Sequence, residues 1–141
     1  MGALEGGKIG HYTYEVKSTY EETSEEYNYQ PTSGTMVRIE DVSALPAKVK
    51  PGDQVELAAT YALLDASPDA DIKIIEIREI RYEGELLGRP EVTLTHKGGT
   101  YSSTVPLFLP KDAKTGTYKV LTTIQAPNVS DSGETSFTVE Q

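Results

Sequence analysis

The sequence predicts an all-β protein: an antiparallel β-sandwich of about seven strands, preceded by an amino-terminal arm. Two observations carry this prediction. Apolar and polar side chains alternate with a period of two over much of the chain after residue 35. Clusters of Gly, Pro, Asp and Asn separate most of these alternating stretches. Two sheets of such strands each hide one apolar face against the other, and neither sheet is expected to be stable alone.

The expected strands follow one another at short intervals. The clearest is DQVELAATYALL, in which Val55, Leu57 and the alternate residues up to Leu63 face one way. The turn Pro51-Gly52-Asp53 precedes it, and Tyr82-Glu83-Gly84-Glu85 is expected to form a hairpin turn. The other strands are expected over residues 35–40, 71–82, 92–96, 101–109, 117–124 and 134–141.

The stretch from residue 71 to 82 has two apolar phases, since Ile72 and Ile74 share one phase while Ile75 and Ile77 share the other. Either both faces of a strand are partly covered or a bulge shifts the phase. A helix is the alternative, but the β-branched residues favour a strand. The charges in and just after this stretch are interpreted as solvated, with weak cross-strand pairs; they are Lys73, Glu76, Arg78, Glu79, Arg81 and Glu83.

Residues 1–34 differ in amino-acid composition from the rest of the chain and are interpreted as a Gly-rich stub followed by a Tyr- and Glu-rich arm. Tyr12, Tyr14 and Val16 alternate with polar residues, which favours a strand. A helix over the acidic run EETSEE and the residues after it is the alternative, but it has no apolar face to bury. The arm is therefore expected to be a linker or extra strands, and residues 35–141 the sandwich domain.

Composition excludes several classes of function. The 141 residues suit one domain with an extension. A net charge of -9 argues against nucleic acid and anionic lipid as partners, because phosphate groups repel an acidic surface. The absence of cysteine excludes disulfides, thiolate nucleophiles and cysteine zinc sites. No apolar run approaches the about 20 residues of a membrane span.

Two short motifs sharpen the fold. Pro51-Gly52-Asp53 would open the second strand of the sandwich, and Gly116-Thr117-Tyr118 would open the penultimate one. With these motifs, residues 35–141 resemble bacterial immunoglobulin-like and fibronectin-like modules. The resemblance implies an immunoglobulin-like sandwich and places Tyr118 at a tyrosine corner, whose hydroxyl ties a loop to the start of a strand. It implies nothing about a ligand.

The opening stretch GALEGGKIG raises the question of location. Gly2, Gly6 and Gly10 are four residues apart, about one helical turn, and would line one face of a helix. The stretch resembles the last turns of a glycine zipper, found in Gram-negative outer-membrane lipoproteins that often continue into a soluble domain. The resemblance implies a periplasmic or outer-membrane-associated protein that touches the membrane only through a segment further upstream. The alternative is a simple linker.

Candidate metal ligands are few. Asp65, Asp69 and Asp71 crowd one loop and form a minor calcium candidate, although their spacing lacks the pattern of a known calcium loop. His11 and His96 are far apart in the sequence, and His96 is interpreted as a solvated residue at the shoulder of a hairpin. No metal or cofactor is therefore expected.

The sequence shows no recognisable set of catalytic residues. Ser102 and Ser103 lack the frame of a serine nucleophile, and the many acids make any carboxylate pair uninformative. The remaining candidates are aromatic residues that form either a binding strip for a sugar or a partner protein, or a strand packed on the sandwich edge or on a second copy. The packed strand is the favoured interpretation; the residues are Tyr12, Tyr14, Tyr20, Tyr27 and Tyr29.

These observations predict a non-enzymatic interaction or structural module of the bacterial cell envelope. A protein partner or self-association is expected, through displayed loops, an edge strand and tyrosine contacts. The alternative is a carbohydrate- or small-ligand-binding accessory domain of a larger secreted enzyme.

Overall fold

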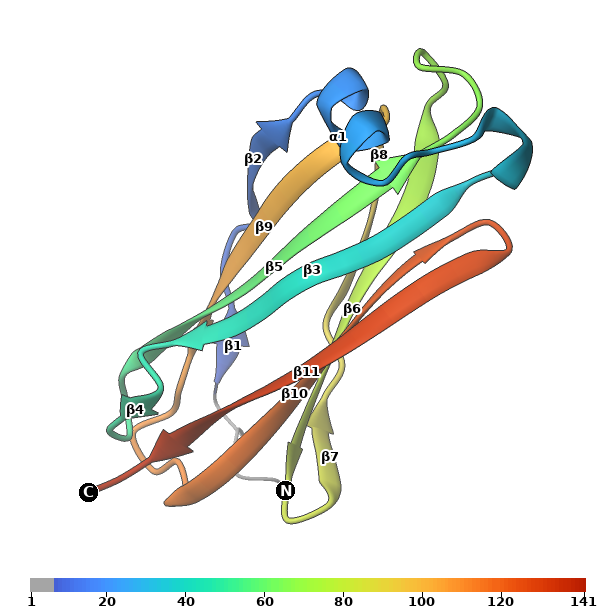
Figure 1. Ribbon diagram of the computed structural model, residues 1–141. Helices are drawn as coiled ribbons and strands as arrows, with labels where there is room; N and C mark the ends of the chain where they lie inside the picture. Colours follow the sequence, from blue (N-terminus) through green and yellow to red (C-terminus); the bar gives the residue numbers. More distant parts are fainter. Residues whose placement is uncertain (1–6) are drawn as a thin grey trace.

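The computed structural model describes residues 7–141 and shows a two-layer β-sandwich (Figure 1). One sheet contains β1 (Lys8–Ile9), β2 (Thr13–Ser18), β9 (Gly99–Phe108), β5 (Gln54–Leu64) and β3 (Met36–Leu45). The other contains β4 (Lys48–Val49), β11 (Val129–Val139), β10 (Gly116–Ala126), β6 (Ile72–Tyr82), β7 (Glu85–Gly88) and β8 (Glu91–His96). The prediction of an all-β sandwich is confirmed.

Most neighbouring strands are antiparallel, and only the short pair β4–β11 is parallel among the strands described. Both β1 and β2 pair with β9, and both β7 and β8 pair with β6, so each sheet has one edge made of two successive short strands. The sequence did not predict β4 and β7, because two and four residues are too few to show an alternating pattern.

The two predicted turns are present. Gly52 has a φ of 88°, and the Asp53 amide donates to the Lys50 carbonyl at 3.0 Å. The Asp53 carboxylate accepts in return from the Lys50 amide at 2.9 Å. In the β6–β7 hairpin, Glu83 and Gly84 have φ values of 50° and 82°, the pair of positive values that a tight type I′ turn requires.

A short helix, α1 (Tyr20–Glu26), and a 3₁₀ turn, η1 (Pro31–Ser33), connect β2 to β3. The strand-like interpretation of this part of the arm is therefore wrong. A capping box starts the helix, since the Thr19 hydroxyl accepts from the Glu22 amide and the Glu22 carboxylate accepts from the Thr19 amide. The helix is anchored by Thr23, which is fully buried and hydrogen-bonds Thr100 at 2.8 Å. One polar anchor replaces the apolar face that was expected to be necessary.

The opening glycines are accounted for only in part, since Gly2 and Gly6 lie outside the described residues. The helix that their spacing predicts is not present at Lys8–Ile9, which is a strand. The Gly10 amide donates to the Pro106 carbonyl at 2.9 Å. A Cβ on Gly10 would lie only 2.6 Å from Pro106 Cγ, so close approach to β9 explains this glycine. Within residues 7–141, no helix has both the length and the apolarity to cross a bilayer.

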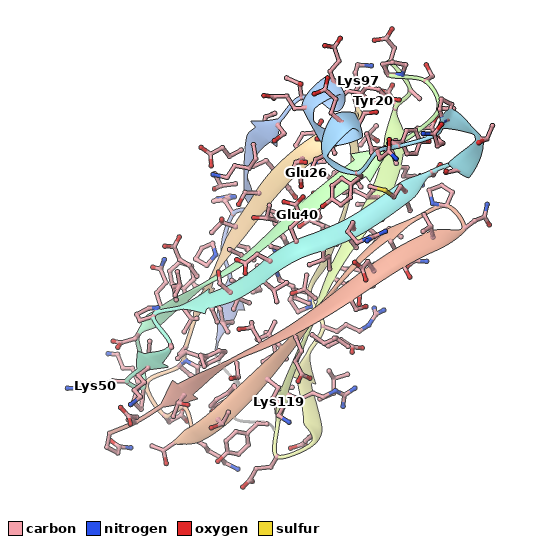
Figure 2. All side chains as sticks on the ribbon, viewed as in Figure 1. Tyr20, Glu26, Glu40, Lys50, Lys97 and Lys119 are labelled. Carbon is pink, nitrogen blue, oxygen red and sulfur yellow. The ribbon has the colours of Figure 1, made fainter. Side chains whose placement is uncertain are left out.

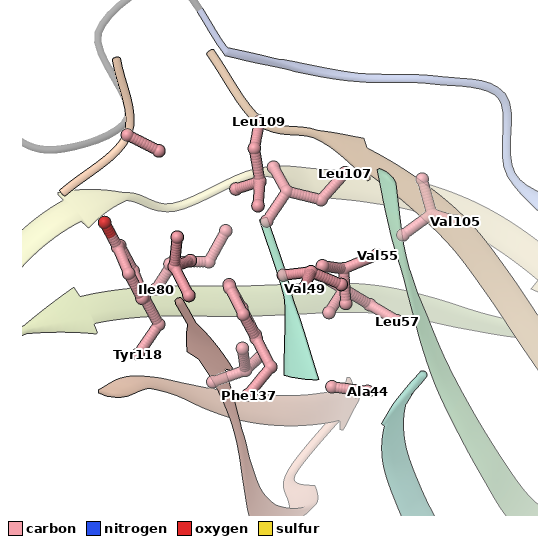
Figure 3. Packing of buried hydrophobic residues seen from close by; sticks show 13 residues of the cluster. Ala44, Val49, Val55, Leu57, Ile80, Val105, Leu107, Leu109, Tyr118 and Phe137 are labelled. Atoms are coloured by element: carbon pink, nitrogen blue, oxygen red, sulfur yellow. The ribbon is translucent and has the colours of Figure 1, made fainter. Parts of the chain in front are cut away.

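The apolar interior consists of two clusters. One fills the end of the sandwich near Tyr118 and Phe137 (Figure 3), and the other surrounds Tyr61 and Ile74. On β9, the buried Ser103 separates the residues of the second cluster from those of the first. On β10, the buried Thr122 occupies the equivalent position. On β6 two charged residues occupy the corresponding positions. A polar layer therefore crosses the core; its buried members are Glu76, Arg78, Ser103 and Thr122.

This layer corrects the interpretation of β6. Glu76 and Arg78 were taken as solvated, but both are 0% exposed. They follow Ile72 and Ile74 in the same inward phase, so the apolar pattern is interrupted by charge rather than shifted by a bulge. Ile77, in the other phase, is also buried, which shows that both faces of the strand are partly covered. The helical alternative is wrong.

The tyrosine corner at Tyr118 is confirmed, because its hydroxyl donates to the Lys114 carbonyl at 2.6 Å. A second corner is present at Tyr101, whose hydroxyl donates to the Lys97 carbonyl at 2.7 Å. Each tyrosine ends a Gly-Thr-Tyr sequence and bonds the carbonyl four residues earlier. This repeated tripeptide is the signal by which the second corner could have been predicted.

Candidate functional site

The first two candidate tyrosines close the gap between the sheets. Tyr14 pairs with Ser103 of β9, and its ring packs edge-to-face on His96 of β8, in the opposite sheet, at 5.4 Å between centroids. The Tyr12 ring lies 5.7 Å from the Arg78 guanidinium carbon. Both rings are half-buried and face the interior. Burial raises the pKa of Tyr14 to about 12 and also raises the pKa of Tyr12.

A buried ion pair lies beneath them. The Arg78 Nη1 atom is 3.1 Å from the Glu76 Oε1 atom. The same oxygen accepts from the Ser103 hydroxyl at 2.6 Å, while Oε2 accepts from the Tyr61 hydroxyl at 2.6 Å. Burial, together with the Glu76 carboxylate, raises the pKa of Tyr61 well above its usual range, so the hydroxyl remains a donor. Both carboxylate oxygens are thus hydrogen-bonded, as a buried charge requires.

The donors and acceptors around this pair are not all satisfied. Four buried side-chain atoms lack a hydrogen-bond partner in the described part of the chain: Tyr12 Oη, Tyr14 Oη, Arg78 Nε and His96 Nε2. Buried polar atoms of this kind cost about 1–3 kcal/mol each when they are left unpaired. They occur in two contacting pairs, Tyr14 with His96 and Tyr12 with Arg78, so unpaired polar atoms lie beside the well-bonded Glu76 carboxylate.

Of the other three candidate tyrosines, Tyr20 lies at the end of the sandwich that carries α1 (Figure 2), and Tyr27 and Tyr29 follow this helix in the chain. The Tyr20 hydroxyl donates to the Asp65 carbonyl at 2.8 Å, and the Tyr27 hydroxyl donates to the Glu40 carboxylate. The Tyr29 hydroxyl donates to a backbone carbonyl beside η1. The five tyrosines do not form one exposed strip, because one group faces the interior and the other is bonded to nearby loops and strands.

The acidic loop is divided by its contacts. Lys97 Nζ lies 3.0 Å from Asp71 Oδ1 and donates to the Asp69 carbonyl at 3.0 Å. Asp65 instead accepts from the Thr35 hydroxyl at 2.8 Å. Across residues 7–141, no group of three or more His, Cys, Asp or Glu side chains is placed to hold a metal ion.

The structure corrects the interpretation of His96. It ends β8 rather than forming the shoulder of a hairpin, because the chain next crosses into β9 of the other sheet. Its ring is half-buried and stacks on Tyr101 at 3.9 Å with an interplanar angle of 8°. Burial lowers its pKa, and the Glu76 carboxylate acts weakly in the opposite direction. His11 is exposed.

The two serines have different environments. Ser102 is half-buried, whereas Ser103 is fully buried in the polar layer and donates to Glu76. No sequence pattern indicated that Ser103 and Glu76 would meet, because they are far apart in the chain and belong to different sheets. Since Glu76 is 0% exposed, no molecule in solution reaches its carboxylate in this arrangement.

Comparisons with known proteins show the fold alone. No protein-family model matches the sequence, and neither does any curated protein. Among solved structures, an alkylpurine DNA glycosylase of Pseudomonas fluorescens is 15% identical with a TM-score of 0.53, over 74% of this chain and 30% of that one. A β-glucosidase of Erythrobacter marinus is 15% identical with a TM-score of 0.54, over 75% of this chain and 16% of that one. A family 123 glycoside hydrolase of Clostridium perfringens is 11% identical with a TM-score of 0.54, over 94% of this chain and 27% of that one. The chain is therefore similar to a β-sandwich part of each of these larger proteins.

Proposed function

We propose that this chain is a non-enzymatic interaction and structural module of the bacterial cell envelope. One observation carries the proposal. The side chains that could act in catalysis, Glu76, Arg78 and Ser103, are hydrogen-bonded to one another inside the sandwich. The solvated surface is left with strand edges, polar side chains and a few exposed apolar ones. A rigid sandwich of this kind acts by presenting its edges and loops to a partner.

Two further observations support the modular part of the proposal. The similar regions make up 30% or less of each of the three solved chains, which is typical of a domain that works within a larger protein. The envelope location rests only on the resemblance of the Gly-rich opening stretch to a glycine zipper. Membrane contact, if the location holds, would run through a segment upstream of the sandwich.

The location is tested by thiol labelling, because the chain has no cysteine of its own. We would place one cysteine at the exposed loop residue Lys111 (Lys111→Cys) in the protein expressed from its full gene in a Gram-negative cell. A maleimide that passes the outer but not the inner membrane should label it in intact cells. Labelling that appears only after lysis, as for a cytosolic single-cysteine control, would contradict the envelope location.

The second candidate is a carbohydrate- or small-ligand-binding accessory domain. Two of the three similar structures are glycoside hydrolases, which favours it. Tyr12 and Tyr14 face the interior, however, which leaves little of either ring to stack on a sugar. Affinity electrophoresis through gels that contain bacterial or plant polysaccharides separates the two candidates. We expect no retardation, and a saturable retardation by one polysaccharide would favour the second candidate.

A further inference from the structure

The outer edge of β8 is free. This strand pairs with β6 on one side only, and no hydrogen bond joins the backbone of Glu91–His96 to any other neighbour within residues 7–141. An unpaired strand edge carries a row of donors and acceptors that can pair with a strand of another chain. Such an edge usually carries features that prevent this pairing.

The edges of β3 and β2 carry register shifts, and the edge of β8 does not. On β3 the register shifts between Ile39 and Asp41, and the Ile39 amide donates to the Asp131 side chain at 2.8 Å. On β2 the register shifts between Val16 and Ser18. By contrast, the six residues of β8 keep a continuous register with β6 and include no Gly, Pro or Lys. Three of them are β-branched, which suits a paired strand.

The sequence of this edge is complementary to itself. If two β8 strands pair antiparallel about a two-fold axis at Leu94, Glu91 lies opposite Lys97 of the second copy, and Thr93 lies opposite Thr95. Each of these pairs then occurs twice, and directly opposite side chains share a face, as antiparallel pairing requires. Shifting the register by two residues, so that the axis passes through Thr93, would instead place Arg89 opposite Lys97 and bring like charges together.

We propose that β8 pairs with β8 of a second copy of this chain, in antiparallel register about Leu94. The proposal deepens the proposed interaction function by naming its partner. Glu91 now pairs with Arg89 at 2.9 Å, and Lys97 bonds the Asp71 carboxylate and the Asp69 carbonyl at 3.0 Å each. These surface contacts contribute little, so both side chains can change partner. Leu94 already packs on the second apolar cluster, and its copy would extend that cover. The result is a symmetric dimer with one continuous sheet across both copies.

Charge exchange tests the pairing. Sedimentation of the wild-type protein up to about millimolar concentration should show a reversible dimer, weak because a single strand edge buries little area. Glu91→Lys and Lys97→Glu should each raise the dissociation constant at least about tenfold, because two attractive pairs become repulsive. A mixture of the two single variants should associate again, since each supplies the charges that the other lacks. The double exchange should also dimerise.

The control is Glu134→Lys, an exposed charge reversal on β11, which should leave the dissociation constant unchanged. Circular dichroism is used to check that every variant is folded. A wild-type protein that stays monomeric at all concentrations overturns the proposal. So does a dimer that neither single variant weakens, or single variants that do not associate when mixed. These outcomes are independent of the labelling test, so the proposed function and this pairing fail separately.

Disulfide formation tests the register. Because the chain has no cysteine, Thr93→Cys and Thr95→Cys each carry a single thiol. Mixed under mild oxidation, the two variants should form the heterodimeric disulfide faster than either forms its own homodimer. Equal rates for all three products would contradict an axis at Leu94.

Discussion

The Glu76 carboxylate and the Arg78 guanidinium are 3.1 Å apart inside the sandwich, and both side chains are 0% exposed. They are on successive inward positions of β6, where isoleucines would continue the apolar row. Glu76 gains bonds from Tyr61 and Ser103 of the opposite sheet, so the pair connects the two layers where the two apolar clusters would otherwise meet. Fold stability should therefore depend on keeping or losing both charges together.

Removing one partner of this pair should be strongly destabilising. We expect Arg78→Met and Glu76→Leu each to lower the free energy of unfolding by about 3–5 kcal/mol, because each leaves an uncompensated charge in the core. The double variant Glu76→Leu/Arg78→Met should lose less than the sum of the two single effects. Urea unfolding monitored by circular dichroism measures this. Arg89→Met, which removes a surface cation, should cost less than about 1 kcal/mol, and purely additive effects in the core would contradict the account.

The two tyrosine corners should be equally important for stability. Tyr118→Phe and Tyr101→Phe each remove a hydroxyl that donates to a backbone carbonyl, so each should cost about 0.5–1.5 kcal/mol in thermal or urea unfolding. Tyr14→Phe is the matched control, because its buried hydroxyl has no partner, and it should be neutral or stabilising. A Tyr14→Phe variant as destabilised as Tyr118→Phe would show that this hydroxyl is bonded.

Stability should fall in mildly acidic solution through His96. Burial holds its pKa below the ordinary value of 6.5, so the unfolded chain takes up the proton first as pH falls. The contribution of this group is complete above about pH 6.5 and decreases as pH falls toward its lower folded pKa. Comparing the free energy of unfolding of the wild type and His96→Phe from pH 7.5 to 5 should show a steeper decline for the wild type. Parallel curves for the wild type and His96→Phe would contradict the prediction.

Gly10 should be required for the attachment of β1. A Cβ there would lie 2.6 Å from Pro106 Cγ and 2.9 Å from Phe108 Cε2, so Gly10→Ala should cost about 1–3 kcal/mol and increase proteolysis before residue 13. At Gly88 the nearest atom to an added Cβ is 4.0 Å away, so Gly88→Ala should be near neutral. If the two variants were equally stable and equally resistant to proteolysis, the close contact with β9 would be wrong.

The sequence predicted the sandwich because long strands such as β5 and β10 show their alternation plainly, and because Pro51-Gly52-Asp53 and Gly116-Thr117-Tyr118 have fixed conformational roles. It did not predict α1, although Thr19 and Glu22 have the spacing of a capping box. The helix depends on the buried Thr23 bond to Thr100, a long-range contact that no local pattern contains.

The polar layer shows a sharper limit of sequence analysis. A charged residue on a strand is normally solvated, and nothing local distinguishes Glu76 and Arg78 from Glu79 and Arg81. Only the inward phase that they share with Ile72 and Ile74 indicates burial. The sequence favoured a packed strand for Tyr12 and Tyr14 but did not indicate where they pack, since this depends on the pairing of β2 with β9 and on the position of β8 in the other sheet.

The central claim is that residues 8–18 belong to the sandwich and close it over the buried ion pair. Hydrogen exchange of the β2 amides that pair with β9 tests it most directly. The account predicts that these amides exchange far more slowly than unfolded chain and that Arg78→Met accelerates them. The contrary result is that the wild-type β2 amides exchange at the rate of unfolded chain while the amides between β9 and β5 stay protected. The arm would then be a detached linker, which would contradict the account.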